Sequence, residues 1–198
     1  MFKGKLKMRG DTEVITYDSV IAGDLYDLTE CYERYLNSGE TVRSAIRHAF
    51  EENVYFGVKA EDEGRGIGYF TFQEDILFTY PHEKLEETVR SFVKNENTVT
   101  VDALMVADRY RGRGIAGRLA EKSLEMLRER GVRYMMVEIW VYPDGRSPAR
   151  RVYEKMGKTV WSSKEELFYK DADKYGISCP ICGKKCVCGA YIEIIEVV

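Results

Sequence analysis

The chain lacks the features that mark several large classes of protein. No apolar run among its 198 residues approaches the ~20 that a membrane-spanning helix needs. Its start, MFKGKLKMRG, has no apolar segment behind the lysines, as a secretion signal would. Neither sign of charge is in large excess, because 30 Lys and Arg stand against 33 Asp and Glu, which gives a formal net charge of -3. These absences disfavour a membrane protein and make a nucleic-acid partner unlikely, and we expect a cytoplasmic protein.

Cysteine is scarce except at one place. Four of the five cysteines lie between residues 179 and 188, and Cys31 stands alone on an expected helix, which is typical of a small core residue. In a reducing compartment such a cluster indicates a metal site more often than disulfides. The two histidines, His48 and His82, lie in no recognisable catalytic setting.

Two pentapeptides of the chain are nearly identical, GRGIG at residues 64–68 and GRGIA at 112–116. Residues 53–60 and 69–72 are rich in aromatic and β-branched side chains, and the EDEGRG between them has the charge and glycine of a hairpin turn. No helix follows to present amides to an anion. We therefore interpret the first copy as part of a hairpin, with its glycines serving the turn.

The rest of the chain alternates between helical and strand patterns. Apolar spacing and breakers predict strands at 13–18, 98–107 and 134–142 and helices at 21–36, 41–52, 81–95 and 115–130. The helix within about 78–97 interrupts consecutive strands, so we interpret it as a packed insertion. A strand, a glycine turn, a helix and another strand from residue 98 onward form a βαβ-like unit.

The second copy, GRGIA, lies where a strand ends and a helix begins. Glycine lets the backbone approach a ligand closely, and the first amides of a helix point outward unsatisfied, with about half a positive charge from the helix dipole. Arg111 and Arg113 add cationic contacts for a diphosphate. No GKS or GKT and no full GxGxxG is present, which disfavours a nucleotide triphosphatase and a dinucleotide oxidoreductase. The segment predicts a site for a phosphorylated cofactor.

Two segments resemble the GNAT acetyltransferase superfamily. The first is VADRYRGRGIAGRLAEKSLEMLRERG, in which the family's cofactor loop, Q/R-x-x-G-x-G/A, corresponds to Arg111, Gly112, Arg113, Gly114, Ile115 and Ala116. The second is PARRVYEKMGK, in which the family's alanine, tyrosine and helix-ending glycine correspond to Ala149, Tyr153 and Gly157. Two positions depart from the family: Arg146 replaces an asparagine, and Lys158 replaces a phenylalanine.

The resemblance covers about residues 13–170 in element order. It implies an α/β fold with a mixed, mostly antiparallel sheet flanked by helices, which we assign to residues 1–172. It also implies acetyl-CoA as cosubstrate and transfer of the acetyl group to a primary amine by direct attack. In the family, backbone groups of the strand before the loop hold the carbonyl and the pantetheine arm, and the matching positions are Leu104 and Val106.

Direct attack also needs an acid for the departing thiolate and a base for the amine. Tyr153 matches the family's general acid, and a phenol with a pKa near ~10 can donate to a thiolate with a pKa near ~8.5. The alternative is a core tyrosine, since it shares a helical face with Ala149, Val152 and Met156.

The base is less clearly marked. Asp102 is one candidate, because alternation places it with Leu104 and Val106 on one face of its strand. Glu138, which alternates with Met136 and Trp140 on the next strand, is the rival, and Glu74 is a third. Some family members instead deprotonate the amine through water.

The tail, residues 173–198, carries CPICGKKCVC with thiols at Cys179, Cys182, Cys186 and Cys188. CPxCG resembles a zinc knuckle, and four thiolates would close a tetrahedral Zn²⁺ site with a structural role. An iron-sulfur cluster or redox disulfides are the alternatives. The strand-like YIEIIEVV after it can pair with the main sheet or with a second copy in a homodimer.

Other functions stay open alongside acetyl transfer. A non-catalytic acyl-CoA sensor would keep the cofactor loop, and Tyr153 would then be replaceable. A nucleic-acid adaptor would use the tail, where Lys184 and Lys185 are a weak basic patch. The acceptor is not specified, because peptide N-termini, lysine side chains, polyamines and other small amines leave the same cofactor signature.

Overall fold

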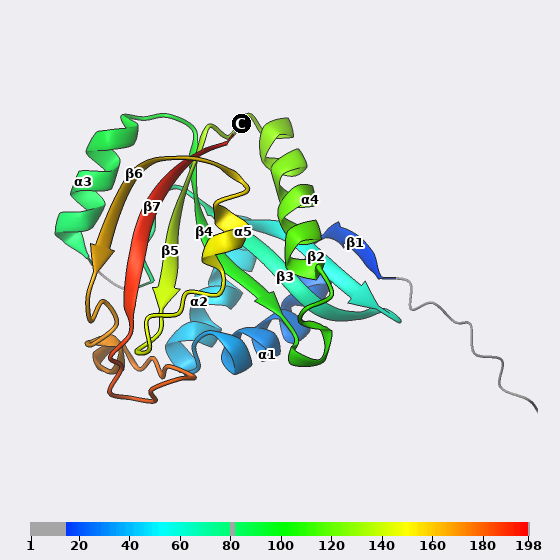
Figure 1. Cartoon of the computed structure of the whole chain (residues 1–198). Coiled ribbons are helices and arrows are strands. Elements are labelled where there is room, and N and C mark those ends of the chain that lie inside the picture. The colour runs from blue at the N-terminus through cyan, green and yellow to red at the C-terminus, as the bar shows by residue number, and fades with distance from the viewer. Residues whose placement is uncertain (1–14, 80–81, 198) are drawn as a thin grey trace, which may run out of the picture.

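A computed structural model describes residues 15–79 and 82–197 of the chain. They form a seven-stranded sheet with the order β1-β2-β3-β4-β5-β7-β6 (Figure 1). β4 and β5 are parallel, and every other neighbouring pair is antiparallel. The predicted mixed, mostly antiparallel sheet is confirmed. Within the described ranges, no helix has the length and apolar character needed to cross a membrane.

The elements follow the predicted order closely. The strands are β1 (Thr16–Ser19), β2 (Tyr55–Asp62), β3 (Arg65–Glu74), β4 (Thr98–Val106), β5 (Tyr134–Val141), β6 (Gly157–Glu165) and β7 (Gly189–Val197). The helices are α1 (Leu25–Tyr35), α2 (Glu40–Glu51), α3 (Glu83–Val93), α4 (Ile115–Glu129) and α5 (Arg150–Tyr153), with short 3-10 turns at Ala22–Asp24, Asp108–Tyr110 and Ala172–Tyr175. The described ranges leave out residues 13 and 14 of the first expected strand and residues 80 and 81 of the expected insertion.

Helices cover both faces of the sheet, so two cores form. The core on one face is built from α1, α2 and α3 and includes Leu28, Ile46 and Val89. The core on the other face lies under α4 and α5 and includes Leu119 and Leu127. In Figure 1, α4 and α5 cross one face while α1 and α2 lie against the other. We call these the α4 face and the α1 face.

The first glycine-rich copy lies in a hairpin, as predicted. Asp62 pairs with Arg65, so Glu63 and Gly64 make a two-residue turn with φ of 51° and 77°. Positive φ at both central residues suits the twist of the flanking strands. Gly66 has another role, because a Cβ there would lie 1.8 Å from the Tyr69 hydroxyl oxygen. Only one glycine of this copy therefore serves the turn itself.

The last strand completes the main sheet. β7 lies between β5 and β6, and its residues pair with both neighbours, for example Ile194 with Met136 and with Trp161. Residues 189–197 thus pair within the chain, which is one of the two options that the sequence left open. Gly157 does not end a helix as the resemblance implied: it begins β6, where a Cβ would lie 2.1 Å from the Glu196 carbonyl oxygen.

Candidate active site at the fork of the sheet

The parallel strands β4 and β5 pair over a short stretch and then separate. Their register runs from Thr98 with Tyr134 to Thr100 with Met136, although β4 continues to Val106 and β5 to Val141. We call the region beyond the last pair the fork. A cavity of about 600 Å³ lies there, lined by both strands. The backbone of β4 therefore borders a cavity on the side where a strand partner would otherwise bind it.

A β-bulge in β4 corrects the predicted alternation. Thr71 of β3 pairs with Ala103 and the next residue, Phe72, pairs with Val101, so Asp102 is the extra residue. A bulge shifts every later side chain to the opposite face. Leu104 and Val106 consequently pack against the core of the α4 face. The prediction that they share a face with Asp102 was wrong, because strict alternation does not survive an inserted residue.

Asp102 itself points to the α1 face. Its carboxylate accepts hydrogen bonds from the Tyr55 hydroxyl (2.6 Å), the Thr71 hydroxyl (3.2 Å) and the Gln73 side-chain amide (3.0 Å). Tyr32 of α1 is also close to Asp102 and acts to lower its pKa. Burial raises the pKa of Asp102, while these neutral donors oppose that shift. The group is thus held in one orientation and made more basic than an exposed aspartate.

Glu138 lies across the fork on the same face. It stands two residues beyond Met136, as Asp102 stands two residues beyond Thr100. Its oxygens accept bonds from the Thr79 amide (3.0 Å), the Thr79 hydroxyl (2.7 Å) and the Tyr169 hydroxyl (3.2 Å). Burial raises the pKa of Glu138, and the nearby Asp102 charge raises it further. The fold therefore brings the two leading base candidates together on the wall of one cavity.

Tyr153 lies on the α4 face of the same cavity. It is buried at 4% exposure and its ring meets Phe70 edge-on, with ring centroids 5.9 Å apart. Burial raises the pKa of the Tyr153 phenol, and the Asp102 charge adds to this shift. The phenol is accordingly protonated at neutral pH and can donate a proton into the cavity.

The second glycine-rich copy has the geometry of an anion site. Gly112 and Gly114 have φ of 75° and 79°, and Gly114 is the N-cap of α4. The amide of Arg118 donates the first hydrogen bond of the helix, to the Gly114 carbonyl (3.1 Å). The amides of residues 115–117 lie before it and have no acceptor within the helix. A Cβ at either glycine would meet no atom within 4 Å, which leaves open space above the loop.

The side chains of the loop are arranged around this opening. Arg111 lies at the cavity, pairs with Asp108 (2.8 Å) and donates through Nε to the Val106 carbonyl (3.0 Å). Ala116 also lines the cavity, whereas Ile115 is buried beneath the loop. Arg113 lies over the Tyr110 ring, with its guanidinium carbon 5.1 Å from the ring centroid.

Several cavity residues carry no signal in the sequence. Tyr32 and Tyr35 come from α1, Gln73 from β3, and Tyr169 from the loop after β6. Only the fold gathers such distant polar and aromatic groups. Conversely, the third base candidate, Glu74, points elsewhere and lies 3.7 Å from Arg130 in an ion pair.

The departures from the family pattern fall in different places. Arg146 lines the cavity beside Ala149 and pairs with Asp144 (2.7 Å), so a cation stands where the family has an amide. Lys158 is exposed on β6. His48 is exposed on α2, and His82 stacks on Phe168 with ring centroids 4.1 Å apart.

The four tail thiols form a cluster that suits a metal. The sulfurs of Cys179, Cys182, Cys186 and Cys188 all lie within 4.8 Å of one another. The amides of Ile181 and Cys188 each donate to a cluster sulfur two residues earlier, both at 3.4 Å. Tetrahedral Zn²⁺ with bonds of about 2.3 Å requires sulfurs about 3.8 Å apart. The donor set and its spacing therefore fit a closed Zn²⁺ site.

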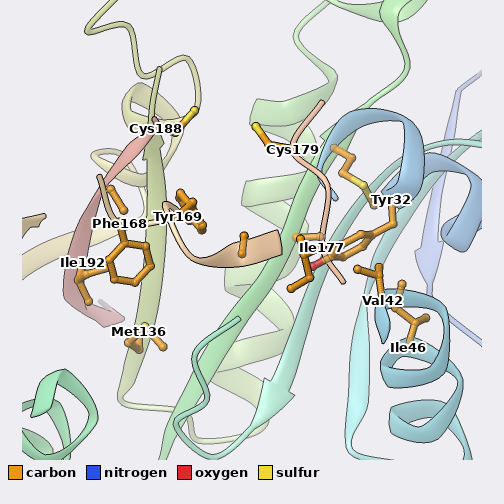
Figure 2. Packing of buried hydrophobic residues seen from close by; sticks show 14 of the residues in the cluster. Tyr32, Val42, Ile46, Met136, Phe168, Tyr169, Ile177, Cys179, Cys188 and Ile192 are labelled. Atoms are coloured by element: carbon orange, nitrogen blue, oxygen red, sulfur yellow. The ribbon is translucent and has the colours of Figure 1, made fainter. Parts of the chain in front are cut away.

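The cluster adjoins the cavity through one short segment. Ser178 exchanges backbone hydrogen bonds with Ser38, in the loop between α1 and α2, at 3.0 and 3.2 Å. Ile177 is buried, lines the cavity and lies beside Tyr32 and Val42 (Figure 2). The segment that leads into the cysteines is thus part of the cavity wall.

The sequence matches the acetyltransferase (GNAT) family over residues 23–158, which is more than two thirds of the chain. The chain therefore belongs to the acetyltransferase (GNAT) family. It matches no curated protein.

Solved structures share the fold at low sequence identity. The ribosomal-protein-S18-alanine N-acetyltransferase of Escherichia coli has a TM-score of 0.62 at 16% identity, over 93% of this chain and 94% of that chain. Arabidopsis thaliana NAA60 with a bisubstrate analogue has a TM-score of 0.64 at 16% identity, over 92% and 98%, and NAA60 is also solved with acetyl-CoA. An agmatine N-acetyltransferase has a TM-score of 0.61 at 15% identity, over 92% and 99%. These structural similarities show that the chain shares the fold of these proteins.

Proposed function

We propose that the protein transfers an acetyl group from acetyl-CoA to a primary amine. The observation that carries the proposal is one cavity that passes through the fork, with Tyr153 on the α4 face and Asp102 on the α1 face. Acetyl-CoA can then enter the cavity from the α4 face, and the amine can approach its thioester from the α1 face. Family membership and an acetyl-CoA complex of a protein with the same fold support this choice.

The cofactor side would be the glycine loop and the unpaired part of β4. The amides of residues 115–117 and the dipole of α4 suit the diphosphate, with Arg111 and Arg113 as additional cations. Leu104 and Val106 lie on the α4 face beyond the last β4–β5 pair, where their backbone borders the cavity and suits the pantetheine arm and the acetyl carbonyl.

The reaction follows from the placement of the two proton-transfer groups. The amine nitrogen attacks the thioester carbon from the α1 face, the carbon–nitrogen bond forms, and the carbon–sulfur bond then breaks. Asp102 takes the proton that the amine loses, directly or through water, and its raised pKa favours that role. Tyr153, on the α4 face, gives a proton to the departing thiolate. We assign the base to Asp102 rather than Glu138 because the Asp102 charge acts on the Tyr153 phenol.

We also infer that the four tail thiols hold Zn²⁺ with a structural role. All four donors would be protein thiolates, so the ion would have no open position for catalysis. Its contribution would be to stabilise the turn at residues 176–188, which supports the cavity wall at Ile177.

Calorimetric titration and a thiol-release assay test the proposed function. Acetyl-CoA should bind the wild type and Tyr153→Phe alike, and CoA thiol should appear with amines only in the wild type. An acyl-CoA sensor would instead bind acetyl-CoA without turnover of any amine or peptide. Failure to bind acetyl-CoA would contradict the assignment of the glycine loop.

A further inference from the structure

The α1-face end of the cavity carries two buried carboxyl groups. Asp102 and Glu138 both line it, and in the described part of the chain every hydrogen bond to their carboxylates comes from a neutral group. The arginines among the cavity residues, Arg111 and Arg146, each pair with a carboxylate close by in the sequence, Asp108 and Asp144 respectively. Among the residues that the structure describes, no cation forms an ion pair with either of these two carboxyl groups.

The positions of the two carboxylates follow from the strand register. Each stands two residues beyond the last β4–β5 pair, formed by Thr100 and Met136, so they face each other across the start of the fork. Their hydrogen bonds fix them from opposite sides, Asp102 through β2 and β3 and Glu138 through Thr79 and Tyr169. Burial raises the pKa of each, which means that a bound cation would relieve an unfavourable pair of buried charges.

The remaining wall at this end suits an alkylammonium ion. The aromatic cavity residues that belong to the α1-face core or pack against it are Tyr32, Phe78, Trp140 and Tyr169. Aromatic rings attract ammonium groups through their faces and pack against methylene chains. The adjoining segment at Ile177 closes the wall beside Tyr32 (Figure 2).

We propose that this end of the cavity binds a small alkylamine with two positive charges, such as an α,ω-diamine, with one nitrogen at Asp102 and the other at Glu138. Resting on the proposed function, this molecule is the acetyl acceptor: the nitrogen at Asp102 is deprotonated and acetylated while Glu138 holds the second ammonium. A peptide N-terminus or a monoamine brings a single ammonium and leaves one carboxylate unbalanced.

Calorimetry with protein saturated with CoA tests the inference without turnover. The probes are 1,4-diaminobutane, 1-aminobutane and a tetrapeptide with a free N-terminus. The diamine should bind the wild type at least about tenfold more tightly than the monoamine. Glu138→Gln should shrink that ratio to less than about threefold. The matched control is Glu74→Gln, an exposed β3 carboxylate outside the cavity, which should keep the wild-type ratio.

The outcomes separate this inference from the proposed function. Equal binding of diamine and monoamine, or tighter binding of the tetrapeptide, overturns the inference whatever the turnover. Both of these outcomes are measured on the wild type, so the test does not depend on whether Glu138→Gln folds. A thermal melt checks the folding of that variant. A diamine that binds tightly in a protein that releases no CoA thiol with any amine overturns the proposed function and supports the diamine site.

Discussion

Gly64 and Gly114 have nearly the same left-handed backbone, with φ of 77° and 79°, and a Cβ at either would meet no atom within 4 Å. They occupy different positions of the repeated pentapeptide, because Gly64 is the first residue of GRGIG and Gly114 is the third residue of GRGIA. Gly64 turns a hairpin, whereas Gly114 caps α4 above the cavity. The same left-handed backbone conformation therefore serves a turn in one place and a proposed ligand site in the other.

This pair gives a matched test of the glycine loop. Gly114→Ala and Gly64→Ala should each destabilise the protein by about 1–2 kcal/mol, because both force an alanine into a left-handed conformation. Only Gly114→Ala should weaken acetyl-CoA binding, since it shifts the amides at the start of α4. Denaturant unfolding and calorimetric titration measure the two effects. Equal acetyl-CoA affinity in both variants would show that the glycine loop is not part of the acetyl-CoA site.

Tyr153→Phe tests the proton donor. Loss of a general acid should lower kcat by about 10²- to 10⁴-fold with little change in acetyl-CoA affinity. The ring contact with Phe70 does not need the hydroxyl, so the fold should persist. Tyr134→Phe, at a partly buried tyrosine outside the cavity, is the control and should keep full activity. A fully active Tyr153→Phe would mean that the tyrosine is a core residue.

The raised pKa of Asp102 predicts a pH dependence of stability. An acid whose pKa is raised on folding favours the folded state fully below its unfolded pKa of about 3.9, and this contribution is lost as pH rises through the folded pKa. Asp102→Asn does not titrate, so its free energy of unfolding should increase relative to wild type as pH rises from about 4 to about 8.

The same variant should be less active although it is relatively more stable at high pH. Removing the base should lower kcat by about 10²- to 10⁴-fold. Urea unfolding across the pH range, compared with Glu74→Gln, isolates the contribution of Asp102. A stability difference that does not change with pH would show that the Asp102 pKa is ordinary in the folded state.

Metal removal should act on stability and on the acceptor side. We expect one Zn²⁺ per chain by metal analysis and a melting temperature lowered by several degrees after chelation. Diamine affinity should fall as well, because Ser178 and Ile177 connect the cluster to the cavity wall, whereas acetyl-CoA binding should persist. Cys186→Ser should reproduce the effect and Cys31→Ser should not. Purified protein with neither zinc nor iron would refute the metal site.

Much of the fold could be predicted because its signals are local. Apolar spacing located α4, and Gly131 after it has the positive φ of 67° expected at a helix end. The sequence also predicted the break between the first two helices and the hairpin turn at Gly64. Each of these features depends on neighbours within a few residues, so one sequence is enough to predict it.

The face on which a strand residue lies was less predictable. Alternation placed Glu138 correctly with Met136 on the α1 face, since β5 is regular in its pairing with β7. It failed at Leu104 and Val106, because the bulge at Asp102 is fixed by pairing with β3. A single extra residue, invisible in the pattern, moves two site residues to the other face of the sheet.

The sequence by itself determined the local chemistry: the glycine loop before α4, the tyrosine at residue 153, and four thiols within ten residues. Only the tertiary structure decided that β4 and β5 separate after Thr100, that Asp102 and Glu138 then face each other, and that β7 enters the sheet between β5 and β6. The physical reason is that strand pairing joins residues far apart in the chain, and its register depends on packing against both cores, which no local pattern encodes.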